Sequence, residues 1–138
     1  MSILGRVRNR LNRYRRTQKL EALSKRCAAQ NVVVKPYQLS HLFEVNENIG
    51  WKDKNVLEIG GDLAGQVARG ILALGARGVT SINLDPDFDL SAKHEGIVRK
   101  LMDARNLELP ENSYDLVFGI AVVEHFREFD RILENVYR

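Results

Sequence analysis

From residue 56 onward, short continuous apolar runs alternate with segments whose apolar residues recur at the spacing of a helix face. The apolar runs cover residues 56–59, 79–85, 96–102 and part of 114–126, and the helical segments cover residues 65–74 and 128–137. Continuous apolar runs are typical of parallel strands that are buried on both faces of a sheet. The pattern therefore predicts an α/β fold with a mostly parallel sheet and helices on both of its faces.

Two helices are predicted before this alternating region. Four apolar residues, Leu4, Val7, Leu11 and Tyr14, are separated by three, four and three positions. This spacing predicts a helix with one narrow apolar stripe. A shorter helix is predicted over residues 39–48, just before the first apolar run.

Charge separates the first helix from the rest of the chain. Residues 1–26 carry nine Lys and Arg residues against one acidic residue, Glu21, which gives a net charge of +8. Because the whole chain has a net charge of +3, the remaining 112 residues sum to −5. We therefore predict a basic helical arm over residues 1–29 and a folded domain over residues 30–138.

Several partners suit a basic helix with an apolar stripe. It fits an anionic membrane surface, an acidic partner or, in a eukaryote, an organelle transit segment, and it also fits a solvated helix packed on the rest of the chain. Tyr14 is the single aromatic residue within residues 1–26, whereas stacking on single-stranded nucleic acid needs several aromatic rings. The solvated helix and contact with an anionic membrane or acidic partner both stay open for this arm, and no specific nucleic-acid partner is expected.

Composition excludes some classes of protein. A chain of 138 residues provides one domain, and none of its apolar runs approaches the roughly 20 residues that span a bilayer. The N-terminus has no secretory signal, and the single cysteine, Cys27, excludes an internal disulfide bond. His41 and His94 have no partners at the spacing of metal ligands, so no metal site is predicted. We expect a cytoplasmic protein.

Three of the predicted strands end in or lead directly to an acidic residue: Glu58, Asp85 and Asp103. The first of these strands continues into a glycine-rich turn over residues 60–65. In parallel sheets, ligands bind at the carboxyl ends of the strands, and a glycine-rich turn lets the backbone approach the ligand closely. Asp85 follows Gly60 by 25 residues, a spacing that suits a carboxylate binding both hydroxyls of a ribose. The sequence therefore predicts a nucleoside-containing cofactor.

Asp62 bears on which nucleoside cofactor this is. A dinucleotide fingerprint, Gly-x-Gly-x-x-Gly, has its second glycine where the pyrophosphate approaches. In "VLEIGGDLAG" that position is Asp62, whose carboxylate would repel phosphate. S-adenosylmethionine has a ribose, a sulfonium and an ammonium but no phosphate. We therefore favour S-adenosylmethionine, and a nicotinamide-dependent oxidoreductase stays open as an alternative.

Four sequence segments support this preference: "VLEIGGDLAG", "SINLDP", "MDARNLELPENSYDLVF" and "AVVEHF". In this order and spacing, residues 54–126 resemble the first half of a class I S-adenosylmethionine-dependent methyltransferase of type 11. The resemblance implies a Rossmann-like three-layer sandwich with the strand order 3-2-1-4. It also implies methyl transfer to a small-molecule, lipid or sugar acceptor.

The resemblance implies roles for residues of the glycine-rich turn. Glu58, Gly60 and the backbone near Gly61 would line the methionine end of the cofactor. Asp62 stands where the family usually has glycine, and it would contact the ammonium of the cofactor or cap the following helix.

The resemblance implies further roles at the ends of the later strands. Asp85 would bind the ribose hydroxyls. Asp103 would accept a hydrogen bond from the adenine amino group, and the backbone amide of Ala104 would meet a ring nitrogen. Ile120 would lie near the reacting methyl group or against the adenine. His125 is the candidate catalytic residue, as a general base for a hydroxyl acceptor.

The family fold has seven strands in the order 3-2-1-4-5-7-6, and the sequence supplies the first four. We therefore expect either a partial methyltransferase domain or a partner chain that covers the exposed edge of the fourth strand. A non-catalytic cofactor-binding fragment, or a scaffold that acts through the basic arm, stays open as an alternative to an enzyme.

Overall fold

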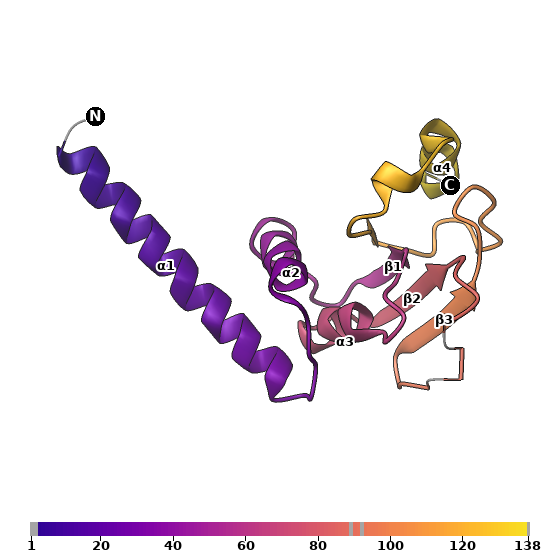
Figure 1. Cartoon of the computed structure of the whole chain (residues 1–138), viewed down its shortest axis with the longest axis horizontal. Coiled ribbons are helices and arrows are strands. Elements are labelled where there is room, and N and C mark those ends of the chain that lie inside the picture. The colour runs from indigo at the N-terminus through magenta and orange to yellow at the C-terminus, as the bar shows by residue number, and fades with distance from the viewer. Residues whose placement is uncertain (1–2, 89, 92, 138) are drawn as a thin grey trace.

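The computed structural model describes residues 3–88, 90–91 and 93–137. Its centre is a four-stranded parallel sheet in the order β3-β2-β1-β4, of which Figure 1 labels β1, β2 and β3. The strands are β1 (Asn55–Ile59), β2 (Gly78–Asn83), β3 (Ile97–Leu101) and β4 (Leu116–Phe118). The predicted α/β class and the strand order 3-2-1-4 are confirmed.

The helices cover both faces of this sheet. They are α1 (Ile3–Ala28), α2 (Pro36–Asn48), α3 (Gln66–Ala73) and α4 (Phe129–Val136), with a 3₁₀ turn, η1, at Val123–His125. One core cluster joins Val56 and Val79 of the sheet to buried residues of α1, α2 and α3. The second joins Leu57 and Ile82 to Ile132 of α4. Because neighbouring residues of β1 belong to different clusters, both faces of the strand are buried, as its continuous apolar run predicts.

Two elements differ from the prediction. The second helix begins at Pro36 rather than Leu39, because proline suits the first helical position and the side chain of Gln38 accepts a hydrogen bond from the backbone of Lys35 at 2.8 Å. The fourth strand has three residues rather than the longer run expected. It stops before a bend in which Ala121 has a left-handed φ of 52°, a conformation that cannot continue a strand.

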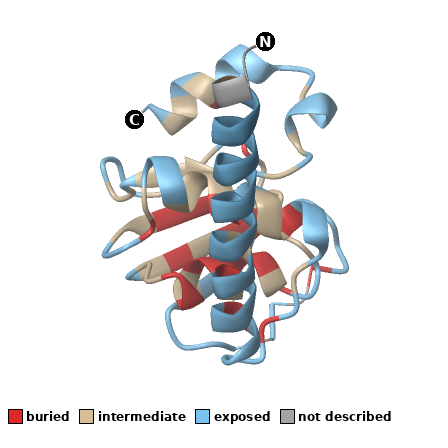
Figure 2. Cartoon of the chain, turned by 90° about the vertical axis from the view of Figure 1, so that its left-hand side faces the viewer, coloured by how far each residue is buried: buried red, intermediate tan, exposed pale blue. Residues whose placement is uncertain are grey.

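The two halves of α1 have different surroundings. Leu23 and Cys27 are buried against the body of the molecule. The first half extends away from the body into solvent (Figures 1 and 2), and Val7, Leu11 and Tyr14 are 51%, 52% and 64% exposed. The side chain of Leu4, which belongs to the predicted stripe, lies outside the described part. Over the described residues, no helix is long and apolar enough to span a membrane.

Candidate functional site

A groove of about 630 Å³ lies at the carboxyl ends of the parallel strands. This volume falls within the range of small-molecule sites, roughly 300–1,000 Å³. The groove is lined by residues that follow β1, β2 and β3 and by the segment after β4. Five of the predicted site residues take part in this lining: Gly60, Asp103, Ala104, Ile120 and His125. The fold therefore brings together residues that are up to 65 positions apart in the sequence.

The segment after β4 closes tightly over the end of β1. Gly60 has a left-handed φ of 71°, and a Cβ atom at this position would lie 2.1 Å from Cγ1 of Val122. The amides of Gly60 and Gly61 both donate hydrogen bonds to the carbonyl of Ile82, at 2.8 and 3.0 Å. Only glycine tolerates this conformation together with so close a neighbour. The glycine-rich turn is thus held between β2 and the segment after β4.

Glu58 lies beneath this turn and outside the groove lining. Its side chain is buried, and it accepts a hydrogen bond from the hydroxyl of Ser81 at 2.5 Å. A Cβ atom on Gly61 would lie 2.0 Å from the Ser81 hydroxyl and 2.8 Å from the Glu58 carboxyl. Burial raises the pKa of Glu58 from its ordinary value of 4.5 to about 7, although the bond from Ser81 opposes the shift. The carboxyl group is therefore bonded inside the protein, and its predicted contact with a cofactor stays a prediction.

Asp62 caps the helix that follows the turn. Its two carboxylate oxygens accept hydrogen bonds from the amides of Gln66 and Val67, at 3.0 and 2.9 Å. Gln66 and Val67 are the first two residues of α3. The amides at the start of a helix have no acceptor within the helix. Of the two roles that the sequence left open for Asp62, capping is the one that this geometry provides.

Arg99 of β3 holds the same turn from across the sheet. One terminal nitrogen of its guanidinium donates to the backbone carbonyls of Asp62 and Leu63, at 3.0 and 2.8 Å. The guanidinium lies over the ring of Phe88, 4.0 Å from its centre. The sequence analysis did not find this residue, because a single arginine within a strand gives no sign of a contact 37 positions away.

Asp85 lies in an exposed turn after β2 and outside the groove lining. One of its carboxylate oxygens accepts a hydrogen bond from the amide of Asp87 at 2.9 Å. Asn83, which the sequence analysis missed, connects this turn to the glycine-rich turn. Its side chain accepts from the Asp85 amide at 2.9 Å and donates to the carbonyl of Gly61 at 2.7 Å. Asn83 lines the groove, and its position at the end of β2 was the available signal.

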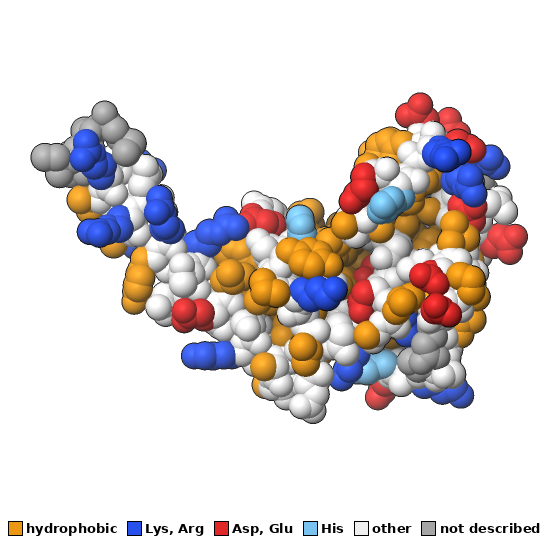
Figure 3. All heavy atoms as spheres, viewed as in Figure 1, with side chains coloured by type: hydrophobic (Ala, Val, Ile, Leu, Met, Phe, Trp, Pro, Cys, Tyr) orange, Lys and Arg blue, Asp and Glu red, His pale blue; other side chains and the backbone are white. Residues whose placement is uncertain are grey.

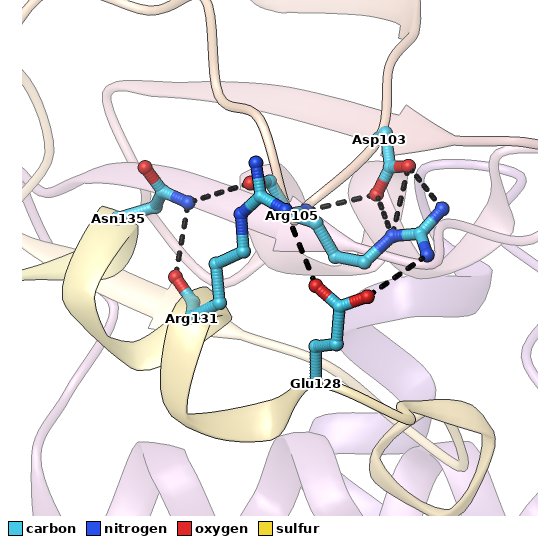
Figure 4. Close-up of polar contacts among 5 residues, drawn as sticks. All are labelled: Asp103, Arg105, Glu128, Arg131 and Asn135. Atoms are coloured by element: carbon cyan, nitrogen blue, oxygen red, sulfur yellow. Dashed lines mark hydrogen bonds and ion pairs between the residues drawn. The ribbon is translucent and has the colours of Figure 1, made fainter.

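Asp103 faces the groove with its charge already paired (Figure 4). The guanidinium of Arg105 contacts both carboxylate oxygens, with the shortest distance 2.6 Å, and these bonds lower the pKa of Asp103. A guanidinium nitrogen of Arg105 also lies 3.8 Å from one carboxylate oxygen of Glu128. The other carboxylate oxygen of Glu128 forms an ion pair with the guanidinium of Arg131 at 3.2 Å. Asn135 donates to the Arg105 carbonyl at 2.8 Å. These contacts fasten α4, near both of its ends, to the chain after β3.

Ala104 lines the groove and has a backbone amide without a hydrogen-bond partner among the described residues. The residue is 6% exposed. A buried amide without a partner is uncommon in folded proteins. The sequence-predicted contact between this amide and an adenine ring nitrogen would supply the partner.

The remaining lining is largely apolar. Eight further apolar side chains surround the groove: Ile59, Ile82, Leu84, Met102, Ala121, Val122, Phe126 and Ile132. His125 comes from η1. A smaller cavity of about 210 Å³ lies between α4 and residues 107–114, and it contains none of the predicted site residues. Among the described residues, no group of three metal-binding side chains occurs.

Comparison with known proteins agrees with this architecture. Residues 57–138 match the methyltransferase domain family. An S-adenosylmethionine-dependent methyltransferase from Mesorhizobium loti superposes with a TM-score of 0.61 at 18% identity, over 72% of this chain and 46% of that chain. The Thermoplasma acidophilum 1320 protein superposes with a TM-score of 0.61 at 19% identity, over 85% of this chain and 63% of that chain.

A third solved structure, phosphoethanolamine N-methyltransferase 1 from Haemonchus contortus, has a TM-score of 0.58 at 23% identity. It was crystallised with phosphoethanolamine and S-adenosylhomocysteine, and the match covers 90% of this chain and 29% of that chain. The chain thus spans less than two thirds of the length of each of these three structures. The sequence comparison with curated proteins found no match.

Proposed function

The chain belongs to the methyltransferase domain family, and on this premise we propose that it binds S-adenosylmethionine in the groove at the strand ends. We further propose that the whole protein transfers the methyl group to a small-molecule, lipid or sugar acceptor. The observation that carries the proposal is the convergence of Gly60, Asp103, Ala104 and Ile120 on one groove of about 630 Å³.

The chemistry of the groove suits an adenosyl group. Adenine needs apolar surfaces for its faces, an acceptor for its amino group and a donor for a ring nitrogen. Ile120 and Met102 supply apolar surface, Asp103 supplies an acceptor, and the Ala104 amide supplies the donor. Arg105 already donates four hydrogen bonds to the two carboxylate oxygens of Asp103, so the adenine amino group would have to share or displace one of these bonds.

The start of α3 argues against a dinucleotide. In dinucleotide-binding proteins the pyrophosphate sits at the N-terminus of this helix and bonds to its free amides. Here Asp62 occupies the amides of Gln66 and Val67. A pyrophosphate would meet a carboxylate at this position, whereas S-adenosylmethionine brings no phosphate. The same geometry favours a cofactor that has cationic groups and no phosphate.

For the reaction itself, S-adenosylmethionine supplies an electrophilic methyl group on a sulfonium. The protein then acts mainly by positioning the acceptor in line with this group. His125 lines the groove and is our candidate for the base that takes a proton from the acceptor. Asp85 is our candidate for the ribose hydroxyls, and it would have to turn from its contact with Asp87 toward the groove.

A titration calorimetry experiment with S-adenosylhomocysteine tests this proposal. We expect one binding site on the full chain and a loss of affinity of about tenfold or more in Asp103→Ala, because a hydrogen bond to a charged group contributes about 1.5–3 kcal/mol. Asp85→Ala should weaken binding as well. Glu108→Ala, which removes an exposed carboxylate outside the groove lining, is the control and should bind as the parent does.

Two outcomes would contradict the proposal. One is the absence of heat on titration with both S-adenosylmethionine and S-adenosylhomocysteine. The other is binding of the reduced nicotinamide dinucleotide in the same groove, detected by its fluorescence and weakened by Asp103→Ala.

A further inference from the structure

The apolar residues of α1 form two stripes on opposite sides of the helix. At about 100° per residue, Leu20, Leu23 and Cys27 share one side, and they pack against the core of the molecule. Three exposed residues of the first half, Val7, Leu11 and Tyr14, lie roughly 180° away around the helix axis. We call these three residues the distal stripe. Because it faces away from the packed side, the body of the molecule does not cover it.

The same half of α1 carries five arginines: Arg6, Arg8, Arg10, Arg13 and Arg15. By helical geometry, Arg10 and Arg15 flank the stripe on either side. Among the described residues, none of the five takes part in an ion pair, whereas the next two cations, Arg16 and Lys19, pair with Glu44 and Glu47 of α2. In the described part of the chain, Arg16 and Lys19 are therefore paired where α1 meets α2, and the five arginines that precede them are not.

This arrangement of charge is unfavourable for the isolated helix. The first turn of α1 contains no acidic residue, so the arginines repel each other and face the positive end of the helix dipole. An anionic surface would relieve both effects. The space-filling view shows these blue side chains along the part of α1 that extends from the body (Figure 3).

We propose that the first half of α1, residues 6–15, lies on an anionic phospholipid surface. The distal stripe would enter the boundary between headgroups and acyl chains, and the flanking arginines would bind lipid phosphates. Nucleic acid would satisfy the arginines but leave Val7 and Leu11 exposed to water. The stripe and its flanking charges together favour a lipid surface, and the inference does not depend on cofactor binding.

The geometry of the chain allows this contact without unfolding. The first half of α1 extends away from the sheet and the other helices (Figure 1), and it is coloured as exposed (Figure 2). Arg16 and Lys19 mark the point where α1 becomes tied to α2. The body would therefore be held near the membrane by a straight helix whose second half belongs to the core.

Co-sedimentation of the full chain with vesicles tests the proposal. We expect binding to vesicles of equimolar phosphatidylserine and phosphatidylcholine, and binding weaker by about tenfold or more to phosphatidylcholine alone. Changing Arg8, Arg10 and Arg15 together to glutamine should weaken binding to the anionic vesicles on the order of 100-fold, at about fivefold for each lost charge. Leu11→Ser should weaken it by about tenfold because the stripe loses apolar area.

Two controls separate this contact from a general effect of charge. Changing Lys52, Arg77 and Lys93 together to glutamine removes the same charge from exposed sites outside α1, and binding should stay within about twofold of the parent. Changing Arg8, Arg10 and Arg15 together to lysine should retain binding. Far-ultraviolet circular dichroism checks that each variant is folded.

Three results would overturn the proposal. The first is the absence of binding to anionic vesicles. The second is an equal loss in the Lys52, Arg77 and Lys93 variant. The third is binding to duplex DNA that is tighter than binding to vesicles and unaffected by Leu11→Ser, which would assign the arginines to nucleic acid.

Discussion

Two carboxylates near the carboxyl edge of the sheet have opposite environments. Near the end of β1, Glu58 is 3% exposed, and its pKa is raised to about 7 by burial. After β3, Asp103 is half-buried at the groove, and its pKa is lowered, chiefly by its bonds with Arg105. The strands are parallel and belong to one sheet. The contrast therefore comes from what the chain does after each strand.

Glu58 is enclosed beneath the glycine-rich turn, whereas Asp103 lies at the wall of the groove. The glycine-rich turn folds back over Glu58 so closely that Gly61 leaves no space for a side chain. After β3 the chain continues along the groove, which leaves Asp103 and the amide of Ala104 at its wall. An acidic residue at a strand end is thus not sufficient to identify a ligand contact.

Gly61→Ala should cause the largest loss of stability among the changes near β1. Its Cβ atom would lie 2.0 Å from the Ser81 hydroxyl, and overpacking of this kind costs about 3 kcal/mol in the free energy of unfolding. Urea denaturation measures the loss. Gly78→Ala is the matched control in the same sheet, because its nearest neighbour would be 3.6 Å away, and it should change stability by less than about 1 kcal/mol. Equal losses in the two variants would contradict the tight packing over Glu58.

Glu58→Gln should change how stability depends on pH. The pKa of Glu58 in the folded chain, about 7, lies above its ordinary value of 4.5, so the folded state holds the proton more strongly than the unfolded state. The stabilisation is complete below the ordinary pKa and is lost as pH rises through 7, by about 3 kcal/mol. The Gln variant should lack this loss when urea denaturation is repeated at about pH 5 and pH 8.

Asp103→Asn is the control for this pH dependence. The pKa of Asp103 is lowered, so its contribution to stability is present above its ordinary pKa and is lost only as pH falls below it. Between about pH 5 and pH 8 the variant should follow the parent. If Glu58→Gln kept the full pH dependence of the parent, the assignment of that dependence to Glu58 would be wrong.

Asp62→Ala should lower the stability by less, and it acts on the turn that follows β1. It removes the cap from the amides of Gln66 and Val67, and loss of a cap costs about 1 kcal/mol in the free energy of unfolding. Asp62→Asn keeps a capping oxygen and should lose less. A thermal denaturation series of the two variants measures the difference, and the same stability for both would argue against the capping role.

Much of the fold follows from the sequence, because apolar runs and helical spacing are local signals. They predict the strands β1 to β3, the helix α3 and the parallel arrangement. They predict too long a fourth strand, since the left-handed conformation of Ala121 depends on packing that the sequence does not reveal. Asp103 and Ala104 reach the groove because they follow the end of β3, which the pattern locates well, whereas Ile120 follows β4, whose end the pattern places too late.

The bonding partners of the site residues could not be predicted in the same way. Ser81 is 23 positions from Glu58, and Arg99 is 37 positions from the carbonyl of Asp62 to which it donates. Such pairs form only when the register of neighbouring strands is set. Arg105 was not predicted as the partner of Asp103 either, although it follows Asp103 by only two positions and the turn after β3 brings the two side chains together.

The central claim is that an adenosyl cofactor occupies the groove beside Asp103, and amide NMR with S-adenosylhomocysteine tests it most directly. We predict that titration shifts the amide signals of Gly60, Ala104 and Ile120, with the signal of Ala104 moving downfield as its free N–H gains an acceptor. The signal of Gly50, outside the groove lining, should stay in place. Unchanged signals at all three groove residues at saturating ligand would contradict the account.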